Sequence, residues 1–305
     1  MTLLSVVMPA FNEAENLPIV HARLIDALAS IGLDWEWVVV DDHSEDGTAV
    51  VLGDLIRAEP RLRFRRLSRN FGSHAAIACG IDAARGDVAV VMAADLQDAP
   101  EDIPRLLEPW QRGAQVVWGT RGPDGSRSPA TSRLYHRLMD RVVGRGALPP
   151  TGADVVLVDR VVLDAIRRAE ESHAHLFMLV SWLGFDQTTV ECNKAPRGHG
   201  ASGWTPTKKW ELAVDSVTAF TDRPLRWIGA LGLTTAALGL LFAVIVIGAA
   251  VLGHPPKAWS AVIVVTLIVG GAQMLTLGVV GTYMWRGLDA ARRRPAYVVE
   301  ATYDG

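Results

Sequence analysis

The sequence predicts an α/β domain with a doubly wound, mostly parallel sheet, followed by an interfacial helix and a two-helix transmembrane hairpin. Two observations carry this prediction. In the first half of the 305 residues, short Val-rich runs alternate with helical stretches, which is typical of parallel sheets covered by helices. Nearer the end, residues 227–256 and 258–285 contain no Lys, Arg, Asp or Glu. Each stretch exceeds the roughly 20 apolar residues that cross a bilayer core.

The alternating pattern places the elements of the α/β domain. Strands are expected over residues 3–8, 35–40, 62–67 and 88–92, and helices over residues 14–31, 47–58 and 74–84. A further helix is expected after Asp98, which can cap its first turn while Glu101 completes a capping box. After about Gly119 the alternation weakens, and residues 121–133 and 197–207 have the Gly, Ser, Pro and Arg content of loops.

The segment before the first apolar stretch has an amphipathic pattern. Trp210, Val214, Val217 and Phe220 recur near helical spacing. This pattern fits a helix lying in the membrane interface, and also an ordinary amphipathic helix packed on the domain. The predicted organisation is a domain over residues 1–204, an interfacial helix over 205–226, transmembrane helices over 227–252 and 258–285, and a tail over 286–305.

Basic residues flank the hairpin on its outer sides. Those outside the hairpin are Arg223, Arg226, Arg286, Arg292, Arg293 and Arg294, whereas the turn carries only Lys257. Because positive charge favours the cytoplasmic side, the chain is expected to be a multi-pass protein of the cell (inner or plasma) membrane. Both termini and the α/β domain are then cytoplasmic.

The charge balance and two glycines indicate which binding partners to expect. The chain has 30 Lys and Arg against 33 Asp and Glu, which argues against a nucleic-acid partner because such proteins usually show a basic excess. A lipid bilayer is the expected partner of the apolar segments. Gly278 and Gly281 would allow close helix packing, so a homo-oligomer stays open.

Polar side chains follow three of the expected strands. They are found in residues 9–13, 41–44 and 95–98. Ligands of open α/β sheets bind beyond the carboxyl ends of the strands, where these side chains would converge. A cluster of carboxylates there suits a hard divalent cation that bridges phosphate oxygens. No Gly-rich phosphate loop follows the first strand, which argues against dinucleotide dehydrogenases and ordinary kinases.

Several motifs in these segments resemble a known enzyme family. Residues 5–13 (SVVMPAFNE), 40–44 (VDDHS) and 46–48 (DGT) resemble family-2 glycosyltransferases of the GT-A fold. Residues 69–72 (RNFG), 84–87 (ARGD) and 95–98 (DLQD), together with the hairpin, are similar to the polyprenyl-phosphate glycosyltransferases. That group includes bactoprenol glucosyltransferases, dolichol-phosphate mannose synthases and aminoarabinose transferases.

The resemblance implies a donor site. Pro9, Phe11 and Glu13 would line the pocket for the donor nucleotide, and Asp42 would bind its base or ribose. Asp95, which also counts as a catalytic residue, would hold Mg²⁺ or Mn²⁺ with the help of Gln97. Such a cation stabilises the charge that develops on a diphosphate leaving group.

The resemblance also implies an acceptor site. Asp154 would be the catalytic acid on the acceptor side, and Arg121 and Arg133 would bind the phosphate of the lipid. Arg197 and His199 would belong to a loop that closes over the site. The implied reaction is an inverting transfer from a UDP- or GDP-linked sugar to undecaprenyl, decaprenyl or dolichyl phosphate. Glucose, mannose, an amino sugar and an N-acetylhexosamine all remain open as the sugar.

Two departures from the family pattern bear on this interpretation. Ala93 stands where the family has the first Asp of Asp-x-Asp, and Val155 and Val156 stand where an aromatic residue and an Arg usually follow the acceptor acid. A catalytically inactive membrane scaffold is therefore one alternative. A polysaccharide synthase is another, but residues 223–227 lack the Gln of its Gln-x-x-Arg-Trp motif and two helices are too few for a channel. Since Asp95 and Asp154 persist, we take an altered but active enzyme as the main interpretation.

Overall fold

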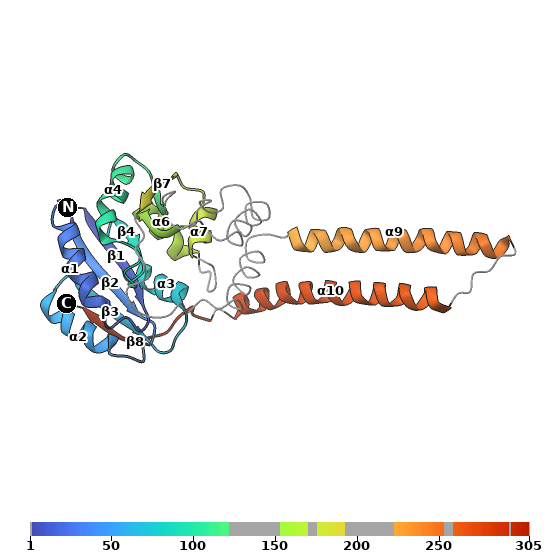
Figure 1. Ribbon diagram of the computed structural model, residues 1–305, viewed down its shortest axis with the longest axis horizontal. Coiled ribbons are helices and arrows are strands. Elements are labelled where there is room, and N and C mark those ends of the chain that lie inside the picture. The colour runs from blue at the N-terminus through green and yellow to red at the C-terminus, as the bar shows by residue number, and fades with distance from the viewer. Residues whose placement is uncertain are drawn as a thin grey trace. The chain divides into compact units, whose positions relative to one another are not determined.

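A computed structural model of the chain describes residues 2–121, 153–169, 176–192, 223–252, 259–292 and 294–304. The chain divides into two compact units (Figure 1). The first consists of Met1–Leu212 with Arg294–Gly305, and the second of Ala213–Arg293. The first unit contains the sheet and its helices, and the second contains two long helices.

The sheet of the first unit is mixed. Its strands are β1 (Leu3–Ala10), β2 (Asp34–Asp41), β3 (Leu62–Leu67), β4 (Val88–Val91), β5 (Val116–Arg121), β6 (Ala153–Asp159), β7 (Gln187–Cys192) and β8 (Val299–Asp304), in the order β7-β5-β6-β4-β1-β2-β3-β8. The central strands β4, β1, β2 and β3 are parallel, as predicted. Strand β6 runs antiparallel to β4 and β5, and β8 runs antiparallel to β3. The α/β class is confirmed, and β5 also pairs in parallel with β7, so the antiparallel pairings of this mixed sheet are those of β6 and β8.

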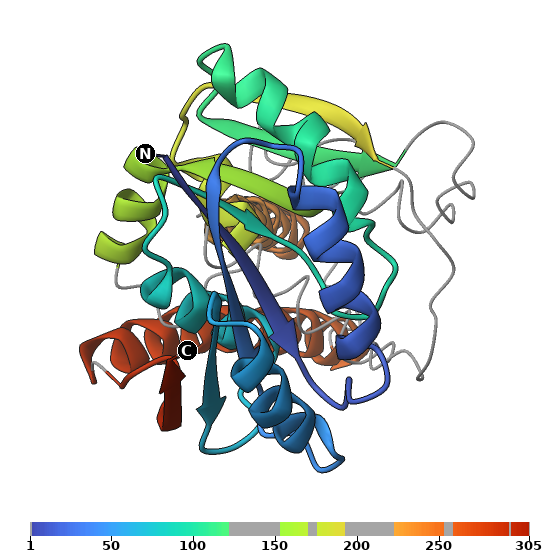
Figure 2. The same ribbon diagram turned by 90° about the vertical axis from the view of Figure 1, so that its left-hand side faces the viewer.

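Helices cover both faces of this sheet. They are α1 (Leu17–Leu28), α2 (Thr48–Ala58), α3 (Ser73–Ala83), the short η1 (Pro100–Asp102), α4 (Ile103–Gln111), α6 (Arg160–Arg168) and α7 (Leu176–Trp182). Helix α1 contacts α2 and α4 on one face, and α3 contacts α6 and α7 on the other (Figure 2). Because both faces are covered, β4 is apolar along its whole length, and Val38, Val39 and Val40 of β2 are completely buried.

Two glycines allow close approach between elements. A Cβ at Gly80 would overlap Cγ1 of Val7, so glycine lets α3 lie directly on β1. A Cβ at Gly86 would lie 2.6 Å from Oγ of Ser5 and 2.7 Å from the carbonyl oxygen of Leu3. The neighbouring Asp87 accepts a hydrogen bond of 2.9 Å from the Leu3 amide. The residue 84–87 motif therefore joins the beginnings of β4 and β1, at the amino edge of the sheet.

The C-terminal residues are part of the sheet. The sequence predicts a tail over residues 286–305, whereas the structure shows β8 paired with β3. Tyr303 stacks on Phe64 with a centroid separation of 4.3 Å, and Asp304 accepts a hydrogen bond of 2.8 Å from Arg63. Such pairing between distant parts of a chain leaves no local sequence signal, which is why the strand was not predicted.

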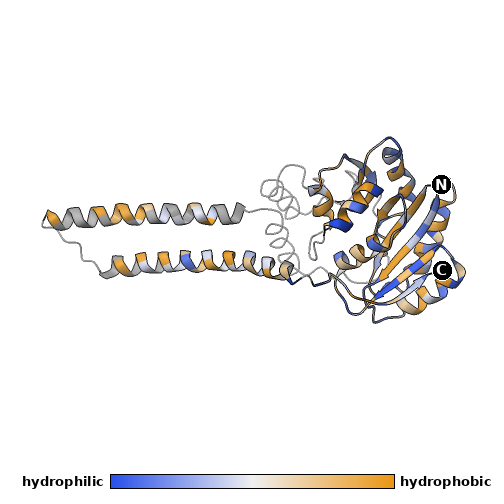
Figure 3. Ribbon diagram, turned by 180° about the vertical axis from the view of Figure 1, so that it is seen from behind, coloured by the Kyte–Doolittle hydropathy of each residue, from blue (hydrophilic) through white to orange (hydrophobic). Residues whose placement is uncertain are grey.

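The second unit consists of α9 (Arg223–Val251) and α10 (Trp259–Ala291), which contact each other. Apolar residues recur along both helices (Figure 3), and Leu240 and Met274 are among those whose side chains are exposed. Within the described residues, one segment, Ile268–Trp285 of α10, is long and apolar enough to span a membrane, with a mean hydropathy of 1.2. The two-helix transmembrane hairpin therefore stays a prediction.

The interfacial helix predicted over residues 205–226 lies outside the described residues, except for 223–226, which begin α9. The Arg-Trp pair that was compared with polysaccharide synthases, Arg226 and Trp227, therefore lies in the first turns of α9.

Candidate active site

The carboxyl ends of the central parallel strands define the candidate site. Ala10 of β1 is in register with Asp41 of β2, which is in register with Arg66 of β3. The chain passes from β1 to β2 and β3 on one side, whereas β4 lies on the other side of β1. The loops after β1 and β4 thus diverge at a topological switch point, where open α/β sheets form their ligand crevice.

The backbone is strained at this edge. Within the described residues, the non-glycine residues with positive φ are Asn12 (58°), His43 (60°) and Leu96 (61°). They lie in the loops after β1, β2 and β4, respectively. A non-glycine residue in the left-handed region costs about 1–3 kcal/mol and persists where the surroundings hold it in place, often at binding and catalytic sites. The strain therefore marks the same three loops that the sequence motifs single out.

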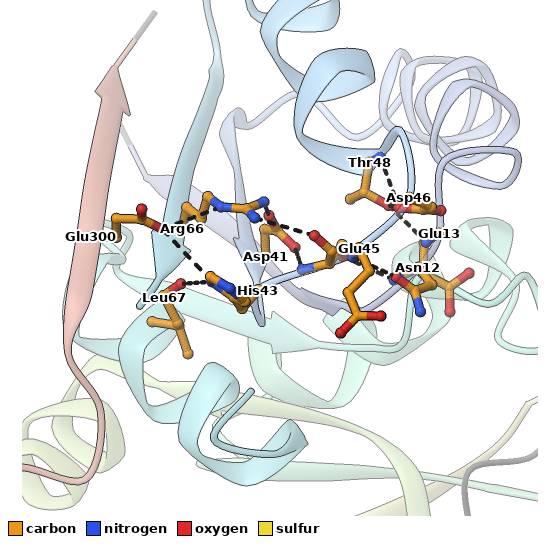
Figure 4. Close-up of polar contacts among 11 residues, drawn as sticks. Asn12, Glu13, Asp41, His43, Glu45, Asp46, Thr48, Arg66, Leu67 and Glu300 are labelled. Carbon is orange, nitrogen blue, oxygen red and sulfur yellow. Dashed lines mark hydrogen bonds and ion pairs between the residues drawn. The ribbon is translucent and has the colours of Figure 1, made fainter. Parts of the chain in front are cut away.

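The loops after β1 and β2 are tied together by hydrogen bonds (Figure 4). The Asn12 amide donates to Oγ of Ser44, and the Glu45 amide donates to Oδ1 of Asn12, both at 2.9 Å. The Glu13 amide donates to Oγ1 of Thr48 at 2.9 Å. Because each loop donates a hydrogen bond to the other, the two loops are held together and form one wall of the site.

Asp46 anchors this wall. Its carboxylate accepts hydrogen bonds from the Thr48 amide at 2.9 Å and from the Ala14 amide at 3.2 Å. Partial burial of the Asp46 carboxylate opposes its ionisation, but the hydrogen bonds from Thr48 and Ala14 outweigh burial and lower its pKa. The residue 46–48 motif, to which the sequence assigned no separate role, thus holds the two loops together.

Asp41 is the buried support of the β2 loop. It is completely buried, and its Oδ1 accepts a hydrogen bond of 2.8 Å from the Ser44 amide. Its Oδ2 accepts a hydrogen bond of 2.5 Å from Arg66, which also donates to the Ser44 carbonyl oxygen at 3.2 Å. A buried carboxylate needs such a counter-charge, so Arg66 keeps the loop in this conformation.

Asp42, a predicted donor-binding residue, holds the start of α3. It is 3% exposed, and its two oxygens accept hydrogen bonds of 2.7 and 2.8 Å from the Phe71 and Gly72 amides. Burial raises the pKa of Asp42, although the bonds from Phe71 and Gly72 lower it. Each Asp42 oxygen already accepts one hydrogen bond. A hydrogen bond from the base or ribose of a donor would therefore have to use the second lone pair of one of these oxygens.

The loop after β3 brings a further aromatic and basic pair to this edge. The guanidinium carbon of Arg69 lies 3.9 Å above the centre of the Phe71 ring. The Phe71 amide is one of the two donors to Asp42, so the pair lies beside the β2 loop. The sequence used Arg69 and Phe71 only for the family resemblance and missed this position, because it depends on the parallel pairing of β2 with β3.

The β4 loop carries the predicted metal ligands. Asp95 is 7% exposed, and its Oδ1 accepts a hydrogen bond of 3.1 Å from the Gln97 amide. The Ala93 amide lies 3.5 Å from Oδ2 of Asp98. Among the residues that the structure describes, no group of three or more His, Cys, Asp or Glu side chains is arranged to hold a metal ion. The roles of Asp95 and Gln97 as metal ligands therefore stay predictions.

The remaining donor-side residues lie after β1. Pro9 belongs to β1 and is in register with Val40. Phe11 is 42% exposed, so its ring is accessible for stacking on a base. The Glu13 carboxylate accepts a hydrogen bond of 2.5 Å from the Asn16 side chain, and its carbonyl oxygen accepts from the Asn16 and Leu17 amides at the start of α1.

The predicted acceptor residues are described only in part. Arg121 ends β5 and Asp154 is the second residue of β6. Since β6 runs antiparallel to β4, with Val156 in register with Val91, the backbone of Asp154 lies at the same edge as the β4 loop. Arg133, Arg197 and His199 lie outside the described residues. The backbones of Asp42, Asp95 and Asp154 thus share one edge, and their individual roles stay predictions.

Comparison with known proteins gives matches over most of the chain. The profile of glycosyl transferase family 2 matches residues 5–159. The chain is 30% identical over 306 residues to the SfII prophage-derived bactoprenol glucosyl transferase of Shigella flexneri, covering 99% of both proteins. It is 31% identical over 303 residues to the undecaprenyl-phosphate 4-deoxy-4-formamido-L-arabinose transferase of Pseudomonas fluorescens, covering 97% of this chain and 88% of that protein.

A solved structure also matches the fold. Mannosyl-3-phosphoglycerate synthase from Rubrobacter xylanophilus superposes with a TM-score of 0.51 at 18% identity, covering 75% of each chain. At this identity the likeness concerns the arrangement of the elements alone.

Proposed function

Because the chain belongs to glycosyl transferase family 2, we propose that this glycosyltransferase moves a sugar from a nucleoside-diphosphate sugar to a polyprenyl phosphate. The observation that carries the acceptor is the match to relatives named for bactoprenol and undecaprenyl phosphate. Those matches cover 97–99% of this chain and therefore include the second unit as well as the α/β domain.

The donor is proposed to bind at the carboxyl edge of β1, β2 and β4. The exposed ring of Phe11 would stack on the nucleotide base, while Asp42 would accept a hydrogen bond from the base or ribose. The hydrogen bonds between the loops support this proposal, because a preformed wall loses little conformational freedom when the nucleotide binds. Both UDP- and GDP-linked sugars remain candidates.

A divalent cation fits the β4 loop as a partner of the donor. Asp95 and Gln97 supply hard oxygen ligands, and Mg²⁺ is commonly held by one or two carboxylates together with substrate phosphates. The absence of a three-ligand cluster in the described residues is consistent with a site completed by the diphosphate. When bound, Mg²⁺ or Mn²⁺ would stabilise the charge on the leaving group.

The acceptor phosphate is proposed to lie beside β5 and β6. Arg121, Arg133, Arg197 and His199 would hold it, and orientation of this kind supplies much of the rate of a transfer between two bound molecules. An oxygen of the lipid phosphate would attack the anomeric carbon opposite the leaving diphosphate, with inversion. A phosphate monoester has a second pKa near ~6, so the nucleophile is largely dianionic at neutral pH. Asp154 would then position the acceptor more than remove a proton.

The second unit is proposed to anchor the enzyme in the bilayer. Exposed apolar side chains along α9 and α10 support this, because such surface is otherwise costly in water. The arginines at the start of α9, and those at and after the end of α10, favour a cytoplasmic α/β domain. The proposed domain boundaries are the ones predicted from the sequence, except that β8 is added to the catalytic domain.

The test is a donor screen with the full-length protein. Purified enzyme is incubated with polyprenyl phosphate, Mg²⁺ or Mn²⁺, and UDP- and GDP-linked sugars in turn, and the lipid product is identified by mass spectrometry. One donor should give a lipid-linked monosaccharide. Asp95→Asn should lower kcat/KM about 100-fold, comparable to removal of one charge-stabilising group.

Asp54→Asn is the matched control, since Asp54 lies on the exposed face of α2 beside Arg57. No product from any donor, or full activity in Asp95→Asn, would contradict the proposal. Ala93 is the observation that favours the second candidate, an inactive membrane scaffold. Calorimetry separates the two, because a scaffold should bind neither a nucleotide sugar nor Mn²⁺.

A further inference from the structure

Strand β8 begins with a contact to the β2 loop. Oε2 of Glu300 lies 3.3 Å from Nε of Arg66 and 3.7 Å from Nδ1 of His43 (Figure 4). Glu300 comes from the strand that follows α10, whereas Arg66 is on β3 and His43 is in the loop after β2. Segments more than 230 residues apart thus meet next to the candidate donor site.

Arg66 carries this contact into the loop. Its guanidinium donates to Asp41 and to the Ser44 carbonyl oxygen, so it holds the loop at both ends of residues 41–44. Asp41 is completely buried and depends on its hydrogen bonds to Arg66 and the Ser44 amide. The orientation of Arg66 therefore determines the conformation of the loop, and Glu300 contacts the Nε side of the same guanidinium.

His43 lies close to both β3 and β8 through one ring nitrogen. Its Nδ1 lies 3.0 Å from the carbonyl oxygen of Leu67 and 3.7 Å from Glu300, in a residue with a positive φ of 60°. Left-handed backbone at a non-glycine residue needs support from its surroundings. The next residue, Ser44, accepts a hydrogen bond from the Asn12 amide in the β1 loop. One chain of contacts thus joins β8 to the loops after β2 and β1.

We propose that Glu300 is a positioning residue, through which β8 holds the β2 loop in its donor-binding conformation by orienting Arg66 and His43. That the β2 loop binds the donor rests on the proposed function. Strand β8 belongs to the same compact unit as the loop that it contacts.

The opposite end of β8 provides a matched control. Asp304 pairs with Arg63 at 2.8 Å, and Arg63 also donates to the buried Glu36 at 3.1 Å. Since β8 is antiparallel to β3, Asp304 lies by the beginning of β3 and Glu300 lies near its end. Both carboxylates form ion pairs with arginines of the same strand, but only Glu300 is connected to the loop after β2.

The experiment compares hydrogen exchange in full-length wild type, Glu300→Ala and Asp304→Ala. In Glu300→Ala, amides of residues 41–45 should exchange about two- to fivefold faster, the range expected for loss of a partly exposed ion pair. The donor KM should rise by the same factor with kcat nearly unchanged. Glu300→Gln keeps an acceptor oxygen for Arg66 and should recover part of both effects. Asp304→Ala should lower the melting temperature while leaving both loop exchange and donor KM at wild-type values.

Unchanged exchange in residues 41–45 of Glu300→Ala would overturn the inference, as would an equal change in Asp304→Ala. Exchange does not require turnover, so the inference and the proposed function fail separately. A protein that transfers no sugar, yet shows faster loop exchange in Glu300→Ala alone, contradicts the proposed function and supports the positioning role of β8.

Discussion

At the scale of single residues, the acidic side chains of the site divide into two groups. Asp41 and Asp46 are used within the protein, since their oxygens accept hydrogen bonds from Arg66, Ser44, Thr48 and Ala14. Asp42 supports the start of α3 while remaining at the proposed base or ribose position. Asp41 and Asp46 thus stabilise the loops beside Asp42.

Ala93 gives a prediction at this scale. Its amide lies 3.5 Å from Asp98, so Ala93→Asp would bring a second carboxylate near Asp95 and Asp98. Like charges in one site repel each other unless a cation is present. Ala93→Asp should therefore lower the melting temperature without metal and tighten Mn²⁺ binding in the presence of a nucleoside diphosphate by about tenfold.

Calorimetry and thermal unfolding with and without Mn²⁺ check this prediction. Ala93→Asn is the control, because it has a similar size and no charge, and it should show neither effect of that size. Weaker Mn²⁺ binding in Ala93→Asp than in wild type would mean that residue 93 does not face the cation.

At the scale of elements, the approach of α3 to the sheet determines the geometry of the donor loops. Helix α3 lies directly on β1 at Gly80, and its first turn is held by Asp42 through Phe71 and Gly72. Displacement of α3 would therefore disturb Asp42 from a distance. The strand pairing on the other side of the loop, between β3 and β8, adds the contact from Glu300.

Gly80→Ala tests the packing of α3. The added methyl group would overlap Val7, and overpacking of this kind costs about 1–3 kcal/mol in the free energy of unfolding. Gly53→Ala on α2 is the control, because no atom lies within 4 Å of the added Cβ. That variant should be neutral or more stable, since alanine favours a helix over glycine by about 1 kcal/mol. Chemical denaturation of both variants measures the difference, and equal stabilities would contradict the close packing.

At the scale of the whole molecule, the chain leaves the α/β unit and returns to it. The first unit contains residues from both ends of the sequence, while the second unit lies between them in the chain. If the second unit crosses the bilayer twice, the chain returns to the side from which it entered, as pairing of β8 with β3 requires. An even number of crossings and the return of the C-terminus to the sheet are thus mutually consistent.

Cysteine labelling tests this topology. In a chain with Cys79→Ala and Cys192→Ala, Lys257→Cys lies in the turn that the hairpin places outside the cytoplasm. A membrane-impermeant maleimide should label it in intact cells. Asp54→Cys, on the exposed face of α2, should be labelled only after the cells are opened. Labelling of residue 257 only in opened cells would contradict the hairpin.

The sequence by itself determined the α/β class, the parallel central strands, the two long apolar segments and the three loops of the candidate site. These features depend on local signals, namely Val-rich runs, turn motifs and uninterrupted apolar stretches, which short windows of sequence contain. The resemblance of residues 5–13 and 40–48 to family-2 glycosyltransferases was likewise a local property, and the family is confirmed.

Only the tertiary structure decided what holds the loops in place. The partners of Asp41 and Asp42 come from β3 and the start of α3, and Glu300 comes from a strand that the sequence took for a tail. Such contacts depend on which strands pair and in which direction, so they join residues that share no window of sequence. The antiparallel pairing of β6 with β4, which brings the backbone of Asp154 to the edge of Asp95, was hidden for the same physical reason.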